Sequence, residues 1–296
     1  MSDYLAEFIK SKKPNISTGS LKTYRSLLSS LFKARGLDEK EGIESIKHAG
    51  DTMSFISEQY KDRPLSTRKT LLAALNAVEP SVIYFAEVSK MSNEYKKNEQ
   101  TQTKTEKQEE NWQTFKQVTA LVKSVQKDTK DLFKSKTPLV GSDLLKAQDY
   151  VILCLTTGVF IHPRRSLDWI EMRLRNPSES NNYMKKMEFV FRTYKTAKQY
   201  GEQEVDIPPK LRTILNKWKK LNPYDALLVN HDGTPITGPR LTQILNRIFQ
   251  RNISTSMLRH IYLTDKYDGM PALQDMQSMA DGMGHSVQQA IEYVKR

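Results

Sequence analysis

Four residues near the end of the sequence have side chains that could act on a phosphodiester. They are the neighbours Arg259 and His260, then His285, which follows a glycine, and finally Tyr293. Arg259 and His285 could hold the non-bridging oxygens, where negative charge builds up in the transition state. The Tyr293 hydroxyl could attack the phosphorus and become covalently attached. Their order and spacing indicate phosphoryl transfer through a covalent intermediate.

This set resembles the second box of the tyrosine recombinases (phage integrase-like family), which reads roughly H-x-x-R-H, then L-G-H, then Tyr about nine residues on. Arg259-His260 matches the R-H pair, and Met283-Gly284-His285 matches L-G-H. Ser256 stands where the family usually has His or Lys, and Tyr293 follows His285 by eight residues. The resemblance implies that Arg259, His285 and Tyr293 are catalytic, with Ser256 and His260 as possible catalytic support.

An upstream segment is similar to the family's first box, roughly G-L-R-x-x-E-L-x-x-L. It runs from Gly158 through Arg164-Arg165-Ser166-Leu167-Asp168 to Trp169. Aligning Asp168 with the acidic residue of the box puts the catalytic arginine at Arg165. Arg164 is the alternative, because the distance from the glycine is longer than usual.

Between the two boxes the sequence pattern changes to that of β-strands. Apolar and polar residues alternate over 187–192 and again over 205–207, on either side of a turn at Tyr200-Gly201. The predicted β-hairpin resembles the one that carries the family's catalytic lysine. Lys195 is the natural match and Lys198 the alternative. Such a lysine can protonate the leaving 5′ oxygen.

Charge and length favour a nucleic-acid-binding protein with two domains. The 296 residues suffice for two domains of ordinary size. The formal charge is +12, and residues 1–105 carry 17 Lys and Arg against 13 Asp and Glu, so both parts are basic. This distribution is typical of proteins that bind nucleic acid, although a soluble protein can also be basic without such a partner.

Several other classes of protein are disfavoured. Cys154 is the only cysteine, which excludes an intrachain disulfide and favours an intracellular setting, in the nucleus or the cytoplasm. The five histidines lack zinc-ligand spacing, so we expect no metal and no cofactor. The longest apolar run, 151–160, is too short to span a bilayer, and no Gly-rich phosphate loop supports nucleotide hydrolysis.

Helical spacing of apolar residues predicts an all-α domain over residues 1–97. Its helices are expected from Ser20 to Gly36, at 40–48, 53–60 and 64–78, and from Pro80 onward with Ile83, Tyr84, Phe85 and Val88 on one face. The domain resembles the helical, SAM-like core-binding domain of recombinases. Residues 98–110 are polar throughout and predict an interdomain linker. The candidate phosphate contacts of this domain are Lys22, Arg25, Arg63, Arg68 and Lys69.

Residues 111–296 are expected to form the catalytic domain. Helices are predicted at 112–125, 144–157, 209–221 and 238–250, a short strand at 226–229, and a helix bearing Arg259 that Ser254 or Ser256 caps. The polar side of the 238–250 helix carries DNA-contact candidates, namely Arg240, Arg247 and Arg251. The predicted fold class is therefore mainly α with a small β-sheet (α+β).

The resemblance implies a site-specific DNA recombinase or integrase of a virus or mobile element. It would cleave and rejoin double-stranded DNA through a 3′-phosphotyrosine, as a homo-oligomer, expected to be a tetramer, on DNA. Tyrosine has a pKa of about 10, so Arg165, Arg259 and His285 would supply the charge that assists its attack. The alternatives are a DNA-relaxing enzyme like the type IB topoisomerases and an inactive DNA-binding protein of the same fold. Tyr262 and Tyr267 are rival nucleophiles.

Overall fold

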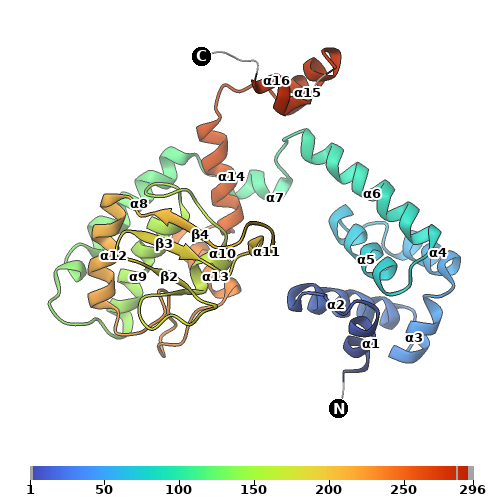
Figure 1. Ribbon diagram of the computed structural model, residues 1–296, viewed down its shortest axis with the longest axis horizontal. Coiled ribbons are helices and arrows are strands. Elements are labelled where there is room, and N and C mark those ends of the chain that lie inside the picture. The colour runs from blue at the N-terminus through green and yellow to red at the C-terminus, as the bar shows by residue number, and fades with distance from the viewer. Residues whose placement is uncertain (1–2, 285, 293–296) are drawn as a thin grey trace. The chain divides into compact units, whose positions relative to one another are not determined.

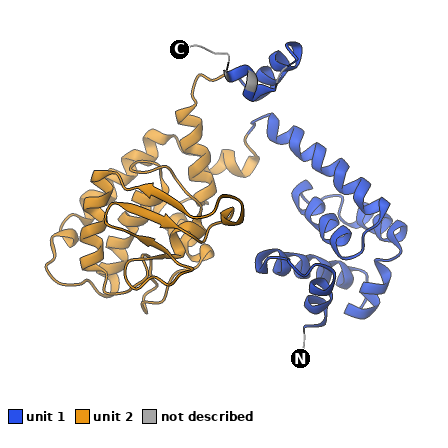
Figure 2. Cartoon of the chain, viewed as in Figure 1, with its two compact units in different colours: residues 1–103, 271–296 blue, residues 104–270 orange. Residues whose placement is uncertain are grey.

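The chain divides into two compact units (Figure 2), in a computed structural model that describes residues 3–284 and 286–292. Unit 1 contains residues 1–103 and 271–296, and unit 2 contains residues 104–270. Helices dominate both units, and the strands form one small sheet in unit 2 (Figure 1). The predicted fold class, mainly α with a small β-sheet, is confirmed. The domain boundaries at 1–97 and 111–296 remain a prediction.

Unit 1 is built on six consecutive helices with one apolar core. They are α1 (Tyr4–Lys12), α2 (Thr18–Ala34), α3 (Glu39–Ser45), α4 (Ala49–Gln59), α5 (Leu65–Val78) and α6 (Val82–Gln100). Phe32 of α2 lies in this core, and a Cβ on Gly42 of α3 would be 2.3 Å from its ring, so this close approach requires glycine. The cap of α2 is Ser17 rather than the expected Ser20, because the Ser17 hydroxyl accepts the Ser20 N–H.

Helix α6 differs from its prediction in two ways. Only Tyr84 of the four expected face residues is buried, with its hydroxyl donating to the Ile46 carbonyl at 2.7 Å. Ile83 and Phe85 are exposed. The helix also continues to Gln100, and α7 (Glu106–Asn111) covers the other end of the segment 98–110, so most of the polar segment is helical. The polar composition of residues 98–110 correctly predicted that this segment does not form a core of its own, but it did not exclude a helical structure.

Unit 2 is organised around one buried helix, α9 (Gly141–Thr156), which begins three residues before the predicted start. Helices α8 (Phe115–Thr129) and α12 (Pro209–Leu221) and the short turn η1 (Leu132–Lys134) all pack against it. The remaining helices are α10 (Ser166–Ile170), α11 (Ala197–Tyr200), α13 (Gly238–Phe249) and α14 (Thr255–Lys266). The predicted helices at 209–221 and 238–250 are thus confirmed to within a residue.

The sheet has the order β1-β2-β3-β4, from β1 (Met172–Arg173), β2 (Asn182–Met184), β3 (Glu188–Phe191) and β4 (Gln203–Asp206). β1 and β2 are parallel, and the other pairs are antiparallel, with Phe189 opposite Val205. The predicted hairpin is confirmed as β3–β4. Val190 is buried, whereas simple alternation placed it on the polar side. The predicted strand at 226–229 forms only two isolated bridges among the residues that the structure describes.

Two further helices, α15 (Leu273–Gly282) and α16 (Val287–Glu292), belong to unit 1. The Leu273 N–H donates to the Gln102 side chain at 2.8 Å, which ties the start of α15 to the residues after α6. Among the helices that the structure describes, none combines the length and the apolar character that crossing a membrane needs.

Candidate active site

The two arginines of the first box differ in their contacts. Arg164 donates to the Asp168 carboxylate at 2.7 Å and to Gln203 of β4 at 3.0 Å. Its guanidinium also lies 3.9 Å from the centre of the Phe191 ring. Arg165, the residue before α10, has no hydrogen bond or ion pair of its side chain within residues 3–284 and 286–292. Arg164 is therefore occupied in holding α10 to the sheet, and Arg165 remains the predicted ligand-binding arginine.

Arg259 on α14 is half-buried and lies close enough to Arg165 for their charges to interact. Burial lowers the pKa of Arg259, and the positive charge of Arg165 lowers it further. The charge of Asp168 acts in the opposite direction but does not outweigh them. No side-chain hydrogen bond of Arg259 occurs in the described part of the chain. The fold thus brings together the two arginines that the separate boxes predicted.

Asp168 is the carboxylate that lies among these arginines. Its burial raises the pKa of the carboxyl, whereas the charges of Arg164, Arg165 and Arg259 lower it. One carboxylate oxygen is paired with Arg164, and the other is buried without a hydrogen-bond partner among the described residues. Three guanidinium groups around one carboxylate leave an excess of positive charge. Such a site is stabilised by an incoming anion.

Ser254 caps α14, because its hydroxyl accepts the Met257 N–H at 3.2 Å, which resolves the choice between Ser254 and Ser256. Ser256 and His260 are exposed and line a cavity of about 300 Å³ with Lys107 of α7 and residues of α13. Arg259 is not part of this lining. The two possible support residues therefore share a face of α14 that borders the cavity.

Tyr262 is built into the core of unit 2. It is 8% exposed, and its hydroxyl is hydrogen-bonded to Nδ1 of His162 at 2.6 Å. A Cβ on Gly158, whose φ is +88°, would lie 2.3 Å from the Tyr262 ring. These contacts argue against Tyr262 as the nucleophile. The other rival, Tyr267, is exposed.

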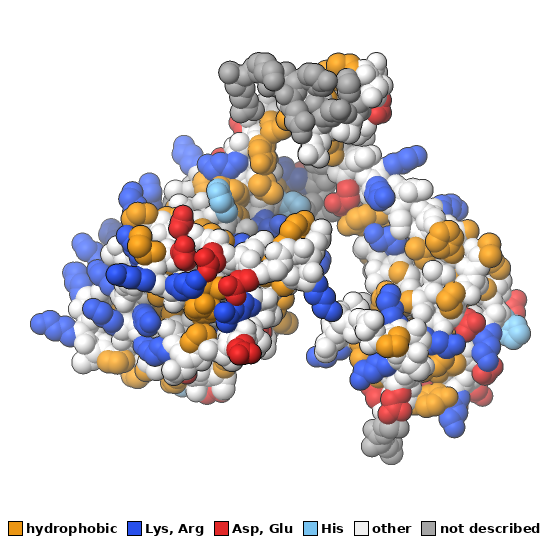
Figure 3. Space-filling view, in the orientation of Figure 1, with side chains coloured by type: hydrophobic (Ala, Val, Ile, Leu, Met, Phe, Trp, Pro, Cys, Tyr) orange, Lys and Arg blue, Asp and Glu red, His pale blue; other side chains and the backbone are white. Residues whose placement is uncertain are grey.

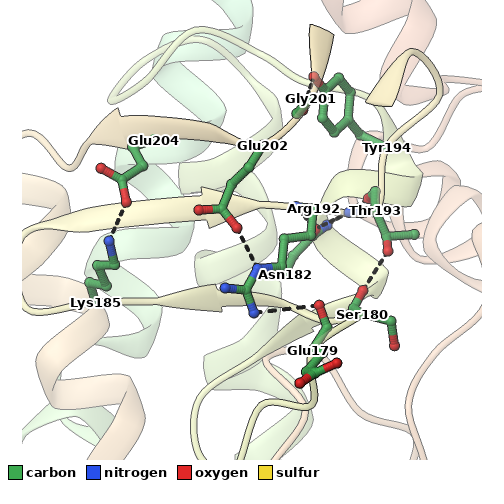
Figure 4. Close-up of polar contacts among 10 residues, drawn as sticks. All are labelled: Glu179, Ser180, Asn182, Lys185, Arg192, Thr193, Tyr194, Gly201, Glu202 and Glu204. Carbon is green, nitrogen blue, oxygen red and sulfur yellow. Dashed lines mark hydrogen bonds and ion pairs between the residues drawn. The ribbon is translucent and has the colours of Figure 1, made fainter. Parts of the chain in front are cut away.

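Lys195 and Lys198 are both exposed on the loop that joins β3 to β4, and α11 carries Lys198. The loop is closed by the Tyr194 hydroxyl, which donates to the Gly201 carbonyl at 2.7 Å, and by an ion pair between Arg192 and Glu202 (Figure 4). Lys195 stands in the turn before α11, next to these fastened residues. The structure therefore places the predicted lysine on a constrained loop.

Some of the predicted DNA contacts have side chains without partners, and the others already contact residues of this chain. Lys22 and Arg63 are exposed and have no side-chain partner among the described residues, whereas Arg25 pairs with Asp3. Arg68 is half-buried, and Lys69 lies 3.8 Å from the Tyr95 ring centre. On α13, Arg240 bonds Gln243 and Arg247 pairs with Asp149, while Arg251 after it bonds the Glu110 carbonyl. Their roles in DNA binding remain predictions.

A lysine-rich surface on α8 and α12 was missed in the sequence. Figure 3 shows Lys and Arg side chains gathered on unit 2 in this region. The exposed lysines are Lys116, Lys123 and Lys127 on α8 and Lys210, Lys217 and Lys220 on α12. The signal was present, because the α12 lysines recur at helical spacing opposite the buried Leu211, Leu215 and Trp218.

His285 and Tyr293 lie outside the described residues, so their predicted roles rest on the sequence alone. Arg165, Lys195 and Arg259 all belong to unit 2. In the parts of the chain described, no three His, Cys, Asp or Glu side chains are grouped so that they could hold a metal ion.

No family model matches the chain. Tyrosine recombinase XerC of Listeria monocytogenes serotype 4a (strain HCC23) is 33% identical over 93 residues, which cover 29% of each protein. XerC of Listeria monocytogenes serotype 4b (strain F2365) is 32% identical over a match of the same length and coverage. The chain is similar to the tyrosine recombinases, as its motifs predicted. The match covers less than a third of the length of these curated relatives.

Two solved structures of recombinases are also similar over most of their length. One is the XerH site-specific recombinase bound to difH substrate in a pre-cleavage complex, with a TM-score of 0.48 and 14% identity over 99% of this chain and 92% of that one. The other is XerA recombinase, with a TM-score of 0.36 and 14% identity over 100% of this chain and 94% of that one.

Proposed function

We propose that this protein is a site-specific DNA recombinase that cleaves and rejoins strands through a 3′-phosphotyrosyl intermediate. The observation that carries the proposal is the proximity of Arg165 and Arg259 to each other and to Asp168, whose carboxylate is already paired with Arg164. Two half-buried cations held near each other repel, and a tetrahedral phosphate with two non-bridging oxygens is an anion that relieves this repulsion. The similarity to tyrosine recombinases supports the same reaction class.

The proposed reaction begins with attack of the Tyr293 oxygen on the phosphorus. The bond from phosphorus to the 5′ oxygen breaks, and Lys195 protonates that oxygen as it leaves. Arg165, Arg259 and His285 would stabilise the charge on the non-bridging oxygens during both cleavage and rejoining. The phosphotyrosyl bond conserves the energy of the broken strand, so a 5′ hydroxyl from a partner strand can reverse the step.

Double-stranded DNA is the proposed partner, and a tetramer on DNA the proposed assembly. The charge of +12 and the exposed lysines of α8 and α12 support binding to the DNA backbone. Affinity should fall on the order of a thousandfold between 50 and 200 mM salt if about six phosphate contacts form. An origin in a virus or mobile element and an intracellular location remain predictions.

Covalent capture tests the chemistry and selects the preferred DNA sequence in the same experiment. A library of duplexes with a randomised segment, each nicked on one strand, is incubated with the protein. The short strand released by cleavage diffuses away, so the adduct accumulates and survives boiling in detergent. Sequencing the captured DNA gives a preferred duplex. Tyr293→Phe should bind this duplex and form no adduct, because it lacks only the nucleophilic oxygen.

Each outcome separates the candidate functions. An adduct that maps to Tyr293 supports the proposal, and one that maps to Tyr267 would move the nucleophile but keep the reaction class. Specific binding with no adduct from the library would favour the inactive DNA-binding protein, for which Ser256 in the usual His or Lys position is the supporting observation. A monomer that relaxes any supercoiled plasmid would favour the topoisomerase.

A further inference from the structure

Asn182, at the start of β2, is fully buried and uses its side-chain amide completely. Its Nδ2 donates to the Asp168 carbonyl at 2.9 Å and to the Thr193 carbonyl at 2.8 Å. Its Oδ1 accepts the Arg192 N–H at 2.8 Å and the Thr193 N–H at 2.7 Å. An amide group has two donors and one oxygen with two acceptor positions, and all four are used. These partners also fix the amide orientation, because its reversal would set donors against donors.

These four bonds join two parts of the candidate site that are distant in sequence. Asp168 lies on α10, one turn after Arg165, and its N–H donates to the Arg165 carbonyl at 3.1 Å. Thr193 lies two residues after the end of β3 and two residues before Lys195. A single buried side chain therefore holds the Arg165 helix and the beginning of the Lys195 loop at a fixed separation.

Further contacts constrain the same loop from outside (Figure 4). The Thr193 hydroxyl donates to the Ser180 carbonyl, and Arg192 pairs with Glu202 near the start of β4. The Lys195 side chain itself has no hydrogen bond or ion pair with any described residue. The position of its ammonium group is therefore governed by the backbone from which it extends. Asn182 makes the hydrogen bonds that link that backbone to α10.

We infer that Asn182 is a positioning residue for Lys195. By fixing Thr193 to α10, it sets where the ammonium group stands relative to the phosphate that Arg165 binds. Proton transfer requires hydrogen-bond distance between the acid and the leaving oxygen. A displacement of about 1 Å can lower a rate by about a hundredfold. The inference rests on the proposed recombinase reaction, and it assigns to Asn182 an effect on one step, the protonation of the 5′ oxygen.

A 5′-thio substrate isolates that step. A thiolate leaves without an acid, so the 5′-thio form of the captured duplex should cleave normally when only proton donation is impaired. We expect Asn182→Ala to slow adduct formation on the oxygen duplex by about a hundredfold, and the 5′-thio duplex to restore a rate near that of the wild type. Lys195→Ala should show the same rescue, and Arg259→Ala should show none, because it acts on the non-bridging oxygens.

Asn222 provides a matched control at the end of α12. It is also fully buried, and it donates to the Ala226 carbonyl at 2.9 Å and accepts the Tyr224 N–H at 3.0 Å. Asn222→Ala should lower thermal stability in the same manner as Asn182→Ala, because both leave buried backbone groups unsatisfied. It should not produce a cleavage defect that the 5′-thio duplex rescues.

Asn182→Asp serves if Asn182→Ala does not fold. It keeps the acceptor for Arg192 and Thr193 but places an oxygen against the two carbonyls, so the loop should shift with less loss of packing. A defect in either folded variant that persists on the 5′-thio duplex would overturn the inference, as would equal rescue of Asn222→Ala. Absence of any adduct with the wild-type protein would overturn the proposed reaction first, and this inference with it.

Discussion

Two arginine–aspartate pairs in unit 2 have the same N···O distance and different surroundings. Arg164 pairs with Asp168 between α10 and the sheet, and Arg247 pairs with Asp149 between α13 and α9, each at 2.7 Å. Both aspartates are buried, and burial raises the pKa of each carboxyl. An ion pair of this kind is therefore not in itself a sign of function.

The difference lies in the charges beyond the pair. Among the described residues, Arg247 is the one charge that acts on Asp149, whereas Arg165 and Arg259 also act on Asp168. In the Arg247–Asp149 region one positive charge balances one negative charge, and the Arg247 side chain is largely exposed to solvent. Near Arg164 and Asp168 there are two further cations, Arg165 and Arg259. Neither of them forms an ion pair with a carboxylate in the described part of the chain. We infer that this excess of charge, rather than the pair, marks the candidate phosphate site.

The largest expected effect separates the two regions by activity. Arg165→Ala and Arg259→Ala should each lower adduct formation on the captured duplex at least about a hundredfold, the usual effect of losing one preorganised charge donor. Neither should lower the melting temperature, because each removal relieves repulsion between like charges. Arg247→Ala is the control: as a DNA-contact candidate it should at most weaken binding of the duplex, and at saturating protein it should form the adduct at nearly the wild-type rate. A similar loss in all three variants would contradict the proposed distinction.

Arg164→Ala should lower the free energy of unfolding more than Arg165→Ala does. Its removal leaves the buried Asp168 without its ion-pair partner and Phe191 without the stacked guanidinium. Breaking a buried pair on one side commonly destabilises by about 3 kcal/mol. Urea denaturation of Arg164→Ala and Arg165→Ala measures the contrast. If Arg165→Ala proved the more destabilising of the two, the assignment of structural and ligand-binding arginine would be reversed.

The sequence predicted these arginines but not how their roles divide. Spacing within each box identified Arg259 and favoured Arg165, with Arg164 as the alternative because adjacent residues share the same local pattern. The choice depends on Gln203 and Phe191, which lie far along the chain and contact Arg164. A tertiary contact of this kind leaves no periodic signal in the sequence.

The long periodic helices were predictable, and the short elements were not. α12 and α13 have clear apolar stripes bounded by proline or glycine, so their ends agreed with the sequence. β1 and β2 have only two and three residues, too few for alternation to be seen. Asn182, at the start of β2, could not be recognised from the sequence either. Its function depends on burial and on four backbone partners, and a single asparagine in a polar stretch reads as a turn.

The effect of Arg247 on stability should be small. Its side chain is 58% exposed, so solvent screens its attraction for Asp149. Pairs between exposed groups contribute about 0.2–1 kcal/mol, and because solvent reaches Arg247 this pair should lie near the upper end of that range even though Asp149 is buried. Urea denaturation should therefore show Arg247→Ala within about 1 kcal/mol of the wild type, well short of Arg164→Ala. A loss as large as that of Arg164→Ala would mean that the two pairs are energetically alike, and the comparison would rest on activity alone.

The smallest effect is the pH dependence that Asp149 contributes. Burial raises its pKa in the folded protein above the ordinary value, even with Arg247 beside it. The protonated form is therefore favoured by folding, and this contribution is present at low pH and lost as the pH rises through the folded pKa. Asp149→Asn places a neutral amide there, so its stability relative to the wild type should increase as the pH is raised from the acid range to neutrality.

Asp131 is the control, since its hydrogen bond with Lys134 lowers the pKa of that carboxyl and Asp131→Asn should change in the opposite direction. A relative stability of Asp149→Asn that falls as the pH rises would show that attraction to Arg247 outweighs burial.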